Sequence, residues 1–245
     1  MKYGFHIGIN YTGSQYQLGG CENDAKEMRN RARAGVKSYY ITQFYLATNV
    51  CTAGFLLDAI AGFARMMKKS DTLYLTFSGH GTQIPGNEAD GMQEGICLWT
   101  GSRIQVVKDS DLRAQLQKIP GTVVCIFDSC FSGGMERNVP IPGKKAKCLT
   151  YDPASMEVFN VPQSKDAAPV AGNRLYYLFA CSEGEVSWDT GTAGLFTKTF
   201  CWAYDVAEPK KRMVASLMRQ TAELCSPNQT PVLKIVSGNG SKRIF

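Results

Sequence analysis

Two runs of mostly apolar and β-branched side chains limit the folds open to this chain. Residues 71–78 read DTLYLTFS and residues 122–127 read TVVCIF, and neither run alternates polar with apolar side chains. Strands of this kind are buried on both faces, as in a parallel sheet with helices on either side. Residues 52–69, which precede the first run, place apolar side chains at helical spacing. This alternation of strand and helix predicts an α/β fold with a largely parallel sheet flanked by helices on both faces.

Apolar runs bounded by turn residues predict the strands, and apolar residues at helical spacing predict the helices. Strands are expected at residues 3–10, 39–47, 71–78, 96–99, 122–127, 174–180 and 231–236. Helices are expected from Asn23 or Asp24, as the cap, to residue 33, and at 52–69, 110–118, 196–206 and 213–224. Residues 132–172 are rich in Gly, Pro, Lys and Asn and are predicted to form a long loop.

The length of 245 residues, 44% of them hydrophobic, suits one domain with one well-buried core. We expect that domain to comprise a larger part at residues 1–136, a linker at 137–172 and a smaller part at 173–245.

Composition narrows the function and the compartment. The net charge is +6, but Lys and Arg are scattered, which disfavours nucleic-acid binding. No signal-peptide pattern and no apolar run of membrane-spanning length is found, so we expect a cytoplasmic protein with no membrane partner. Nine cysteines without a CxxC pair indicate free thiols in a reducing compartment. The sequence contains no HExxH, GxxxxGK[ST] or strand-linked GxGxxG, which argues against a metal hydrolase or a nucleotide-binding module.

Two of the predicted strands end in residues of catalytic type. His80 follows the strand at 71–78, and Cys130 follows the strand at 122–127. Active sites in parallel α/β sheets gather at the carboxyl ends of the strands, so these two side chains are expected to lie close together. A thiol beside an imidazole can act as a nucleophile with its general base. The other histidine, His6, is expected to be a packed residue of the first strand, and Cys97, Cys125 and Cys201 to be inert core thiols.

The residues around these strand ends resemble those of the metacaspases, a family of caspase-like cysteine peptidases. The matching segments are Ser78-Gly79-His80-Gly81, Asp128-Ser129-Cys130-Phe131-Ser132-Gly133, Gly8-Ile9-Asn10-Tyr11 and Gly20-Cys21-Glu22-Asn23-Asp24-Ala25. The resemblance is good over residues 3–136 and looser beyond. It implies that His80 is the base and Cys130 the nucleophile, and that the backbone N–H groups of Gly81 and Cys130 form the oxyanion hole.

The resemblance also implies a pocket for the residue before the scissile bond, the S1 pocket, built from Cys21, Asp24, Ser78 and Asp128. Two carboxylates there would favour Arg or Lys in protein or peptide substrates. Asp128 lies two residues from the nucleophile, where its charge would disfavour a thiolate unless it binds a cation. The alternative for Asp24 is a helix N-cap.

Many metacaspases are activated by calcium through acidic residues downstream of the histidine. In this chain the available hard oxygen ligands are Asp90, Glu94, Asp109, Asp111 and Glu136. The family pattern is richer in carboxylates, since Gln93 and Ser110 occupy two of the comparable positions. Calcium as an activator and a set of solvated loop acids both stay open, and the chemistry itself requires no cofactor.

Members of the family often cut themselves between their larger and smaller parts. Here the basic residues of the predicted loop that could serve as self-cleavage sites are Arg137, Lys144, Lys145, Lys147 and Lys165. A soluble basic loop without processing is the alternative.

The leading functional hypothesis is a cysteine endopeptidase that cleaves after Arg or Lys through an acyl-enzyme. A catalytically silent caspase-fold scaffold is the second hypothesis, although it would more naturally have lost His80 or Cys130, and both are present. Cleavage after Asp would need a basic S1 pocket, whereas the matched positions are acidic. The resemblance favours a monomer, because no dimerising edge strand can be identified.

Overall fold

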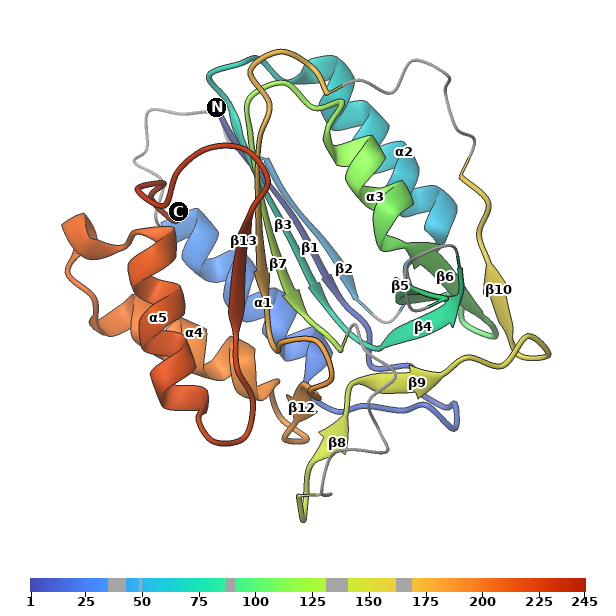
Figure 1. Ribbon diagram of the computed structural model, residues 1–245. Coiled ribbons are helices and arrows are strands. Elements are labelled where there is room, and N and C mark those ends of the chain that lie inside the picture. The colour runs from blue at the N-terminus through green and yellow to red at the C-terminus, as the bar shows by residue number, and fades with distance from the viewer. Residues whose placement is uncertain (35–42, 49, 87–90, 131–140, 162–168) are drawn as a thin grey trace.

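The computed structural model describes residues 1–34, 43–48, 50–86, 91–130, 141–161 and 169–245. A six-stranded sheet in the order β13-β11-β7-β3-β1-β2 forms its centre (Figure 1). The strands are β1 (Lys2–Gly8), β2 (Gln43–Thr48), β3 (Thr72–Ser78), β7 (Thr122–Asp128), β11 (Arg174–Phe179) and β13 (Val232–Ile235). All neighbours are parallel except β13, which runs antiparallel to β11.

Helices cover both faces of this sheet (Figure 1). Helices α2 (Ala53–Met66) and α3 (Asp109–Leu116) lie on one face, and α1 (Cys21–Ala34), α4 (Leu195–Val206) and α5 (Val214–Cys225) on the other. Along β3, Leu73 and Leu75 join the cluster that holds α2, whereas Tyr74 joins the cluster that holds α4 and α5. Because successive side chains point to opposite faces, a strand buried on both sides is mostly apolar and does not alternate polar with apolar residues. The predicted α/β class is confirmed.

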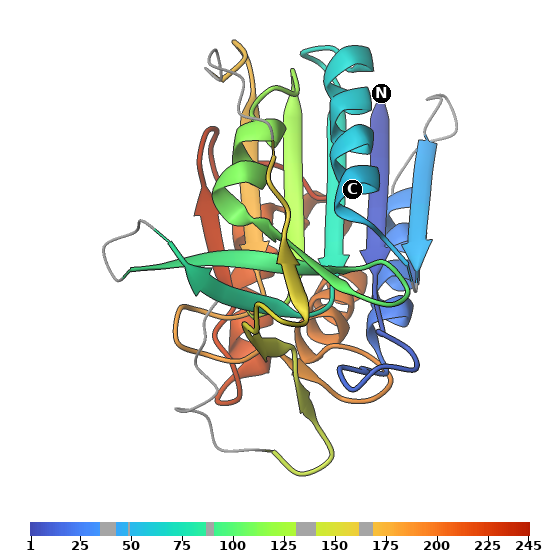
Figure 2. The same cartoon turned by 90° about the vertical axis from the view of Figure 1, so that its right-hand side faces the viewer.

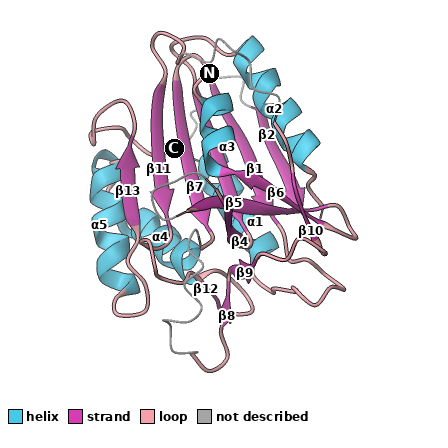
Figure 3. Ribbon diagram, turned by 45° about the vertical axis from the view of Figure 1, so that its right-hand side comes forward, coloured by secondary structure: helices cyan, strands magenta, loops and turns pink. Residues whose placement is uncertain are grey.

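A second sheet crosses the main strands near their carboxyl ends (Figure 2). Its order is β10-β6-β5-β4-β9, and a two-stranded sheet pairs β12 with β8. The strands are β4 (Gly81–Pro85), β5 (Met92–Trp99), β6 (Ile104–Lys108), β8 (Lys145–Ala146), β9 (Cys148–Thr150), β10 (Met156–Val158) and β12 (Trp188–Asp189). Figure 3 shows β8, β9 and β12 beyond the carboxyl ends of the main strands.

The long loop predicted at 132–172 contains three short strands in its described part, β8, β9 and β10, which the prediction missed. These strands have two or three residues each, too few to show a periodicity. β4 and β6 were not predicted either, and β5 is longer than the expected 96–99. A short 3-10 helix, η2 (Pro209–Lys211), follows α4.

The start of α1 also differs from the prediction, and this matters for the site. The helix begins at Cys21 because the Asn10 side chain accepts hydrogen bonds from the N–H groups of Cys21 and Glu22, at 2.9 and 3.4 Å. Asp24 is inside the first turn and buried, so the N-cap alternative is wrong. Its carboxylate does not cap the helix and is free to contact the Lys147 ammonium in the site described below.

All nine cysteines are buried and none forms a disulfide, as the absence of CxxC spacing indicated. Within the described residues, no helix combines the length and the apolar character that crossing a bilayer requires.

Candidate active site

His80 and Cys130 leave the sheet from adjacent strands. β3 and β7 are paired in register, with Ser78 opposite Asp128 at their ends. Gly81 lies so close to the loop after β7 that a Cβ at this position would overlap the carbonyl oxygen of Cys130. A glycine at position 81 therefore permits the two loops to meet.

The N–H groups of Gly81 and Cys130 point at one acceptor. Both donate to the carbonyl oxygen of Lys147, at 3.0 and 3.2 Å. These are the two N–H groups that the metacaspase resemblance assigns to an oxyanion hole. The carbonyl that they hold belongs to the chain's own backbone, at the peptide bond between Lys147 and Cys148.

The imidazole of His80 is held on one side by the backbone. Its Nε2 lies 2.8 Å from the carbonyl oxygen of Tyr16, which can only accept, so Nε2 carries a proton. Within the part of the chain that the structure describes, the buried Nδ1 has no hydrogen-bond partner. Burial lowers the pKa of His80 to about 4, although the bond to Tyr16 opposes this shift. The neutral ring has a lone pair on Nδ1 that can accept a proton, and its lowered pKa makes it a weaker base than an exposed imidazole.

Tyr11 fixes the loop that carries this histidine. The Tyr11 hydroxyl donates to the carbonyl oxygen of Cys97, at 2.6 Å, and accepts from the backbone N–H of His80, at 2.8 Å. Its ring also lies against the imidazole, with centroids 4.8 Å apart. The buried phenol thus links β5 to the turn between β3 and β4.

The thiol of Cys130 is fully buried and accepts a hydrogen bond from the N–H of Ser187, at 2.9 Å. Burial raises its pKa well above the usual value, and contacts with the thiols of Cys148 and Cys181 add to the shift. The group is a neutral thiol in this state, so attack on a carbonyl needs a base to take its proton.

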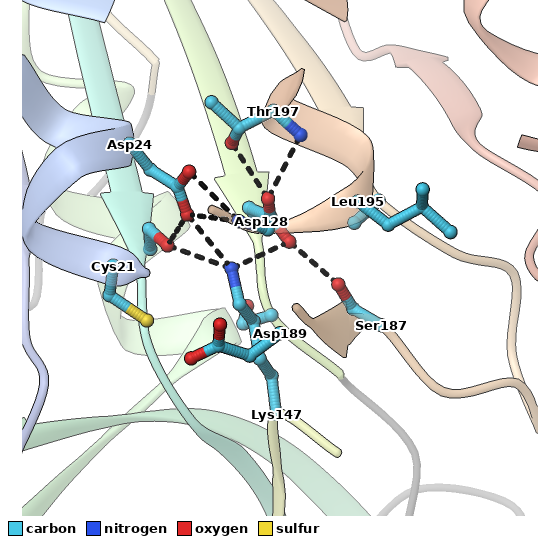
Figure 4. Close-up of polar contacts among 12 residues, drawn as sticks. Cys21, Asp24, Asp128, Lys147, Ser187, Asp189, Leu195 and Thr197 are labelled. Carbon is cyan, nitrogen blue, oxygen red and sulfur yellow. Dashed lines mark hydrogen bonds and ion pairs between the residues drawn. The ribbon is translucent and has the colours of Figure 1, made fainter. Parts of the chain in front are cut away.

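All four residues predicted to form the S1 pocket line one site, and the side chain of Lys147 fills it (Figure 4). The Lys147 ammonium lies 3.1 Å from Asp24 Oδ2, 3.0 Å from Asp128 Oδ1 and 2.9 Å from Ser78 Oγ. An ammonium has three N–H donors, and each has an acceptor here. Cys21 is fully buried beside the same group.

Polar groups from the segment before α4 and from its first turn complete the pocket. Asp128 accepts from the hydroxyls of Ser187 and Thr197, at 2.6 and 2.7 Å. Asp24 accepts from the N–H of Gly194, at 2.9 Å. Asp189 accepts from the N–H groups of the glycines before α1 and adds a third carboxylate near Lys147.

The charged groups of the pocket are buried, and they shift one another's pKa values. Burial opposes a charge on Lys147, but the carboxylates of Asp128 and Asp24 outweigh it, and the pKa of the ammonium is raised well above its usual value. Burial raises the pKa of Asp24 to about 6, although Lys147 acts in the opposite direction. The pocket therefore holds a cation most strongly above about pH 6, where Asp24 is ionised.

Four residues of the pocket were not predicted from the sequence: Ser187, Asp189, Gly194 and Thr197. They belong to the segment after β11, whose carboxyl end lies at the same edge of the sheet as those of β3 and β7. The turn Asp189-Thr190-Gly191-Thr192-Ala193-Gly194 before a helix was the available signal.

The candidate self-cleavage residues differ sharply in their surroundings. Lys147 is completely buried in the pocket. Lys145 is exposed, with its ammonium bonded to the carbonyl oxygen of Gln17 at 2.9 Å, and Lys144 is half-buried. Arg137 and Lys165 lie outside the described residues.

The candidate calcium ligands do not assemble into a site within the described residues. Glu94 and Asp109 line one cavity of about 410 Å³, and Asp111 is buried on α3. Gln93 donates to Ser110 at 2.7 Å, as amide and hydroxyl rather than as carboxylates. No group of three His, Cys, Asp or Glu side chains suited to a metal occurs in the described ranges, and Asp90 and Glu136 fall outside them.

The comparison with protein families decides the assignment. The model of the caspase domain, a peptidase family, matches residues 3–239. The chain belongs to the caspase-domain peptidase family. It is also similar to metacaspase-6 of Arabidopsis thaliana, with 30% identity over 138 residues, and to metacaspase-1 of Kluyveromyces lactis, with 34% over 139 residues. These matches cover 53% and 52% of this chain, and 37% and 32% of the two relatives.

Two solved structures are similar in fold to nearly the whole of this chain. A protein of Geobacter sulfurreducens superposes with a TM-score of 0.73 at 21% identity, covering 99% of this chain and 97% of that one. Caspase-1 of Spodoptera frugiperda superposes with a TM-score of 0.58 at 15% identity, covering 97% and 85%. The expected caspase-like fold and the metacaspase resemblance are both confirmed.

Proposed function

We propose that this caspase-family peptidase cleaves proteins after Lys or Arg, and that its first substrate is its own Lys147–Cys148 bond. One observation carries the proposal: the Lys147 side chain fills the acidic pocket while its carbonyl oxygen accepts from the N–H groups of Gly81 and Cys130. A peptidase substrate meets the same two demands, recognition of one side chain and polarisation of the adjacent carbonyl.

The backbone on both sides of Lys147 is extended, as a substrate must be. Before the bond, β8 pairs antiparallel with β12, and the Lys147 N–H donates to the carbonyl oxygen of Ser187 at 2.9 Å. After the bond, β9 pairs parallel with β4. The segment from Lys145 to Thr150 thus lies across the site like a bound peptide and keeps other substrates out until it leaves.

The proposed reaction uses the groups already described. Nδ1 of His80 takes the proton of the Cys130 thiol as Sγ bonds to the carbonyl carbon of Lys147. The N–H groups of Gly81 and Cys130 stabilise the oxyanion. The C–N bond to Cys148 breaks as the imidazolium protonates the leaving amine, and water then hydrolyses the thioester and returns the thiol.

Specificity for a basic residue follows from the pocket. Two buried carboxylates and a hydroxyl satisfy all three donors of a Lys ammonium. An acidic side chain would add a further negative charge beside Asp24, Asp128 and Asp189 with no cation to offset it, at a cost of several kcal/mol. Arg carries the same charge as Lys and can share the two carboxylates.

The test is hydrolysis of matched fluorogenic peptides ending in Lys, Arg or Asp, with and without calcium, by wild type and Cys130→Ala. We expect turnover of the Lys and Arg peptides and its loss, by at least 10³-fold, in the variant. Turnover of the Asp peptide would overturn the pocket assignment and leave the nucleophile intact. A folded wild type that cleaves no peptide would favour the catalytically silent scaffold.

A further inference from the structure

Strand β4 holds the segment that follows the proposed scissile bond. β4 begins with Gly81, one of the two proposed oxyanion donors, and pairs on one edge with β5 and on the other with β9, the three residues after Lys147. The register places Gly81 opposite Cys148, Thr82 opposite Leu149 and Gln83 opposite Thr150. β9 is the outermost strand of its sheet, so its departure exposes the edge of β4.

One side chain reinforces this pairing. The hydroxyl of Thr82, which is fully buried, donates to the carbonyl oxygen of Leu149 at 2.8 Å. Leu149 is the second residue after the scissile bond, the P2′ position. The acceptor is a backbone carbonyl oxygen, so any substrate with an extended segment at this position can make the same hydrogen bond.

The side chains after the bond enter two different surroundings. Cys148, at P1′, is buried in a small cluster with Cys130, Val186 and Trp188. Leu149 is half-buried against the main apolar core, and Thr150 is exposed. The first subsite after the bond is thus small and apolar, the second takes an aliphatic side chain, and the third is open to water.

We infer that β4 is a docking strand for the part of a protein substrate that follows the scissile bond, with Thr82 binding the P2′ carbonyl. This inference rests on the proposed function and adds the substrate class. The preferred substrates are unfolded or extended protein segments that continue at least three residues past the cut, with a small residue at P1′ and an aliphatic one at P2′. A substrate that ends at the cleaved bond leaves the edge of β4 unpaired.

The inference is tested with two peptides that share Lys-Ala-Lys before the bond. The first ends in a fluorogenic amide, and the second continues with Ala-Leu-Thr and carries a fluorophore and quencher at its ends. The measured quantity is the ratio of kcat/KM for the longer peptide to that for the shorter one. For the wild-type protein after self-cleavage we expect a ratio of at least 10, from the added strand pairing and the buried P2′ side chain.

Thr82→Val keeps the shape of the side chain and removes the hydroxyl. We expect it to lower the ratio about fivefold, the effect of one lost hydrogen bond, and Thr82→Ser to restore it. The matched control is Thr221→Val on α5, which removes a buried hydroxyl that donates to the carbonyl oxygen of Leu217 at 2.7 Å, away from the site. This control should leave the ratio unchanged.

The remaining outcomes separate the two proposals. Equal kcat/KM for both peptides in wild type, or an unchanged ratio in Thr82→Val, overturns the docking role of β4 and leaves the peptidase activity standing. Cleavage of neither peptide overturns the proposed function and this inference with it. Cleavage of the longer peptide alone supports both.

Discussion

At the scale of single residues, the acidic pocket depends on a glycine as much as on its carboxylates. Gly194 begins α4 as its cap, and its N–H donates to Asp24. A Cβ at this position would overlap both the Asp128 carboxylate and the Lys147 ammonium. Any larger residue at 194 therefore competes for the space that the Lys147 ammonium occupies.

We predict that Gly194→Ala lowers kcat/KM for Lys and Arg peptides by about 100-fold, the loss of roughly 3 kcal/mol of charge-assisted binding. The matched control is Gly54→Ala on α2, where a Cβ meets nothing within 4 Å, and it should keep wild-type activity. Steady-state kinetics with thermal melting of both variants checks this prediction. A Gly194→Ala enzyme that is folded and fully active would show that the cation binds elsewhere.

The residues of the site differ in how far the sequence could predict them. His80, Cys130 and Asp128 end or follow the clearly patterned strands β3 and β7, and Asp24 was placed by the resemblance alone. The structure brings Asp24 and Asp128 to one ammonium. Five basic residues were equal candidates for self-cleavage, because each lies in the same weakly patterned stretch. Which lysine reaches a pocket built from Asp24, Ser78 and Asp128, which are far apart in the chain, depends on tertiary packing that local spacing does not encode.

At the scale of elements, long buried strands were predictable and short edge strands were not. β3 and β7 match the predicted runs to within a residue, since seven consecutive buried positions leave a strong pattern. β8 and β9 have two and three residues, and their partners β12 and β4 hold them in place. These two short strands present Lys147 to the site, so the element that bears most on function carried the weakest sequence signal.

At the scale of the whole molecule, two buried histidines couple folding to pH. His6 lies in β1, with its Nδ1 2.9 Å from the hydroxyl of Thr76, and burial together with the charge of Arg29 lowers its pKa to about 3. The pKa of His80 is lowered to about 4, chiefly by burial. Both rings are neutral in the folded protein at pH 5, whereas an unfolded chain protonates them below about pH 6.5. Stability contributed by the neutral rings is present above pH 6.5 and is lost as pH falls toward 4.

We predict that each histidine lowers the free energy of unfolding by about 2 kcal/mol between pH 6.5 and pH 5, at about 1.4 kcal/mol per pH unit. His6→Asn removes one titrating group, so the difference between the two pH values should shrink by about 2 kcal/mol relative to wild type. Urea unfolding at both pH values measures it. If the free energy of unfolding changed equally between pH 6.5 and pH 5 in wild type and His6→Asn, His6 would be protonated in the folded protein as it is in the unfolded chain.

The most direct test of the self-cleavage account is a time course of intact mass for purified wild type, Cys130→Ala and Lys147→Gln, with Lys144→Gln as the matched control. We predict that wild type and Lys144→Gln convert to two fragments, residues 1–147 and 148–245. Cys130→Ala and Lys147→Gln should stay whole, because the first lacks the nucleophile and the second the cation that Asp24 and Asp128 bind. Cleavage that persists in Cys130→Ala, or a folded wild type that never divides after Lys147, would contradict the account.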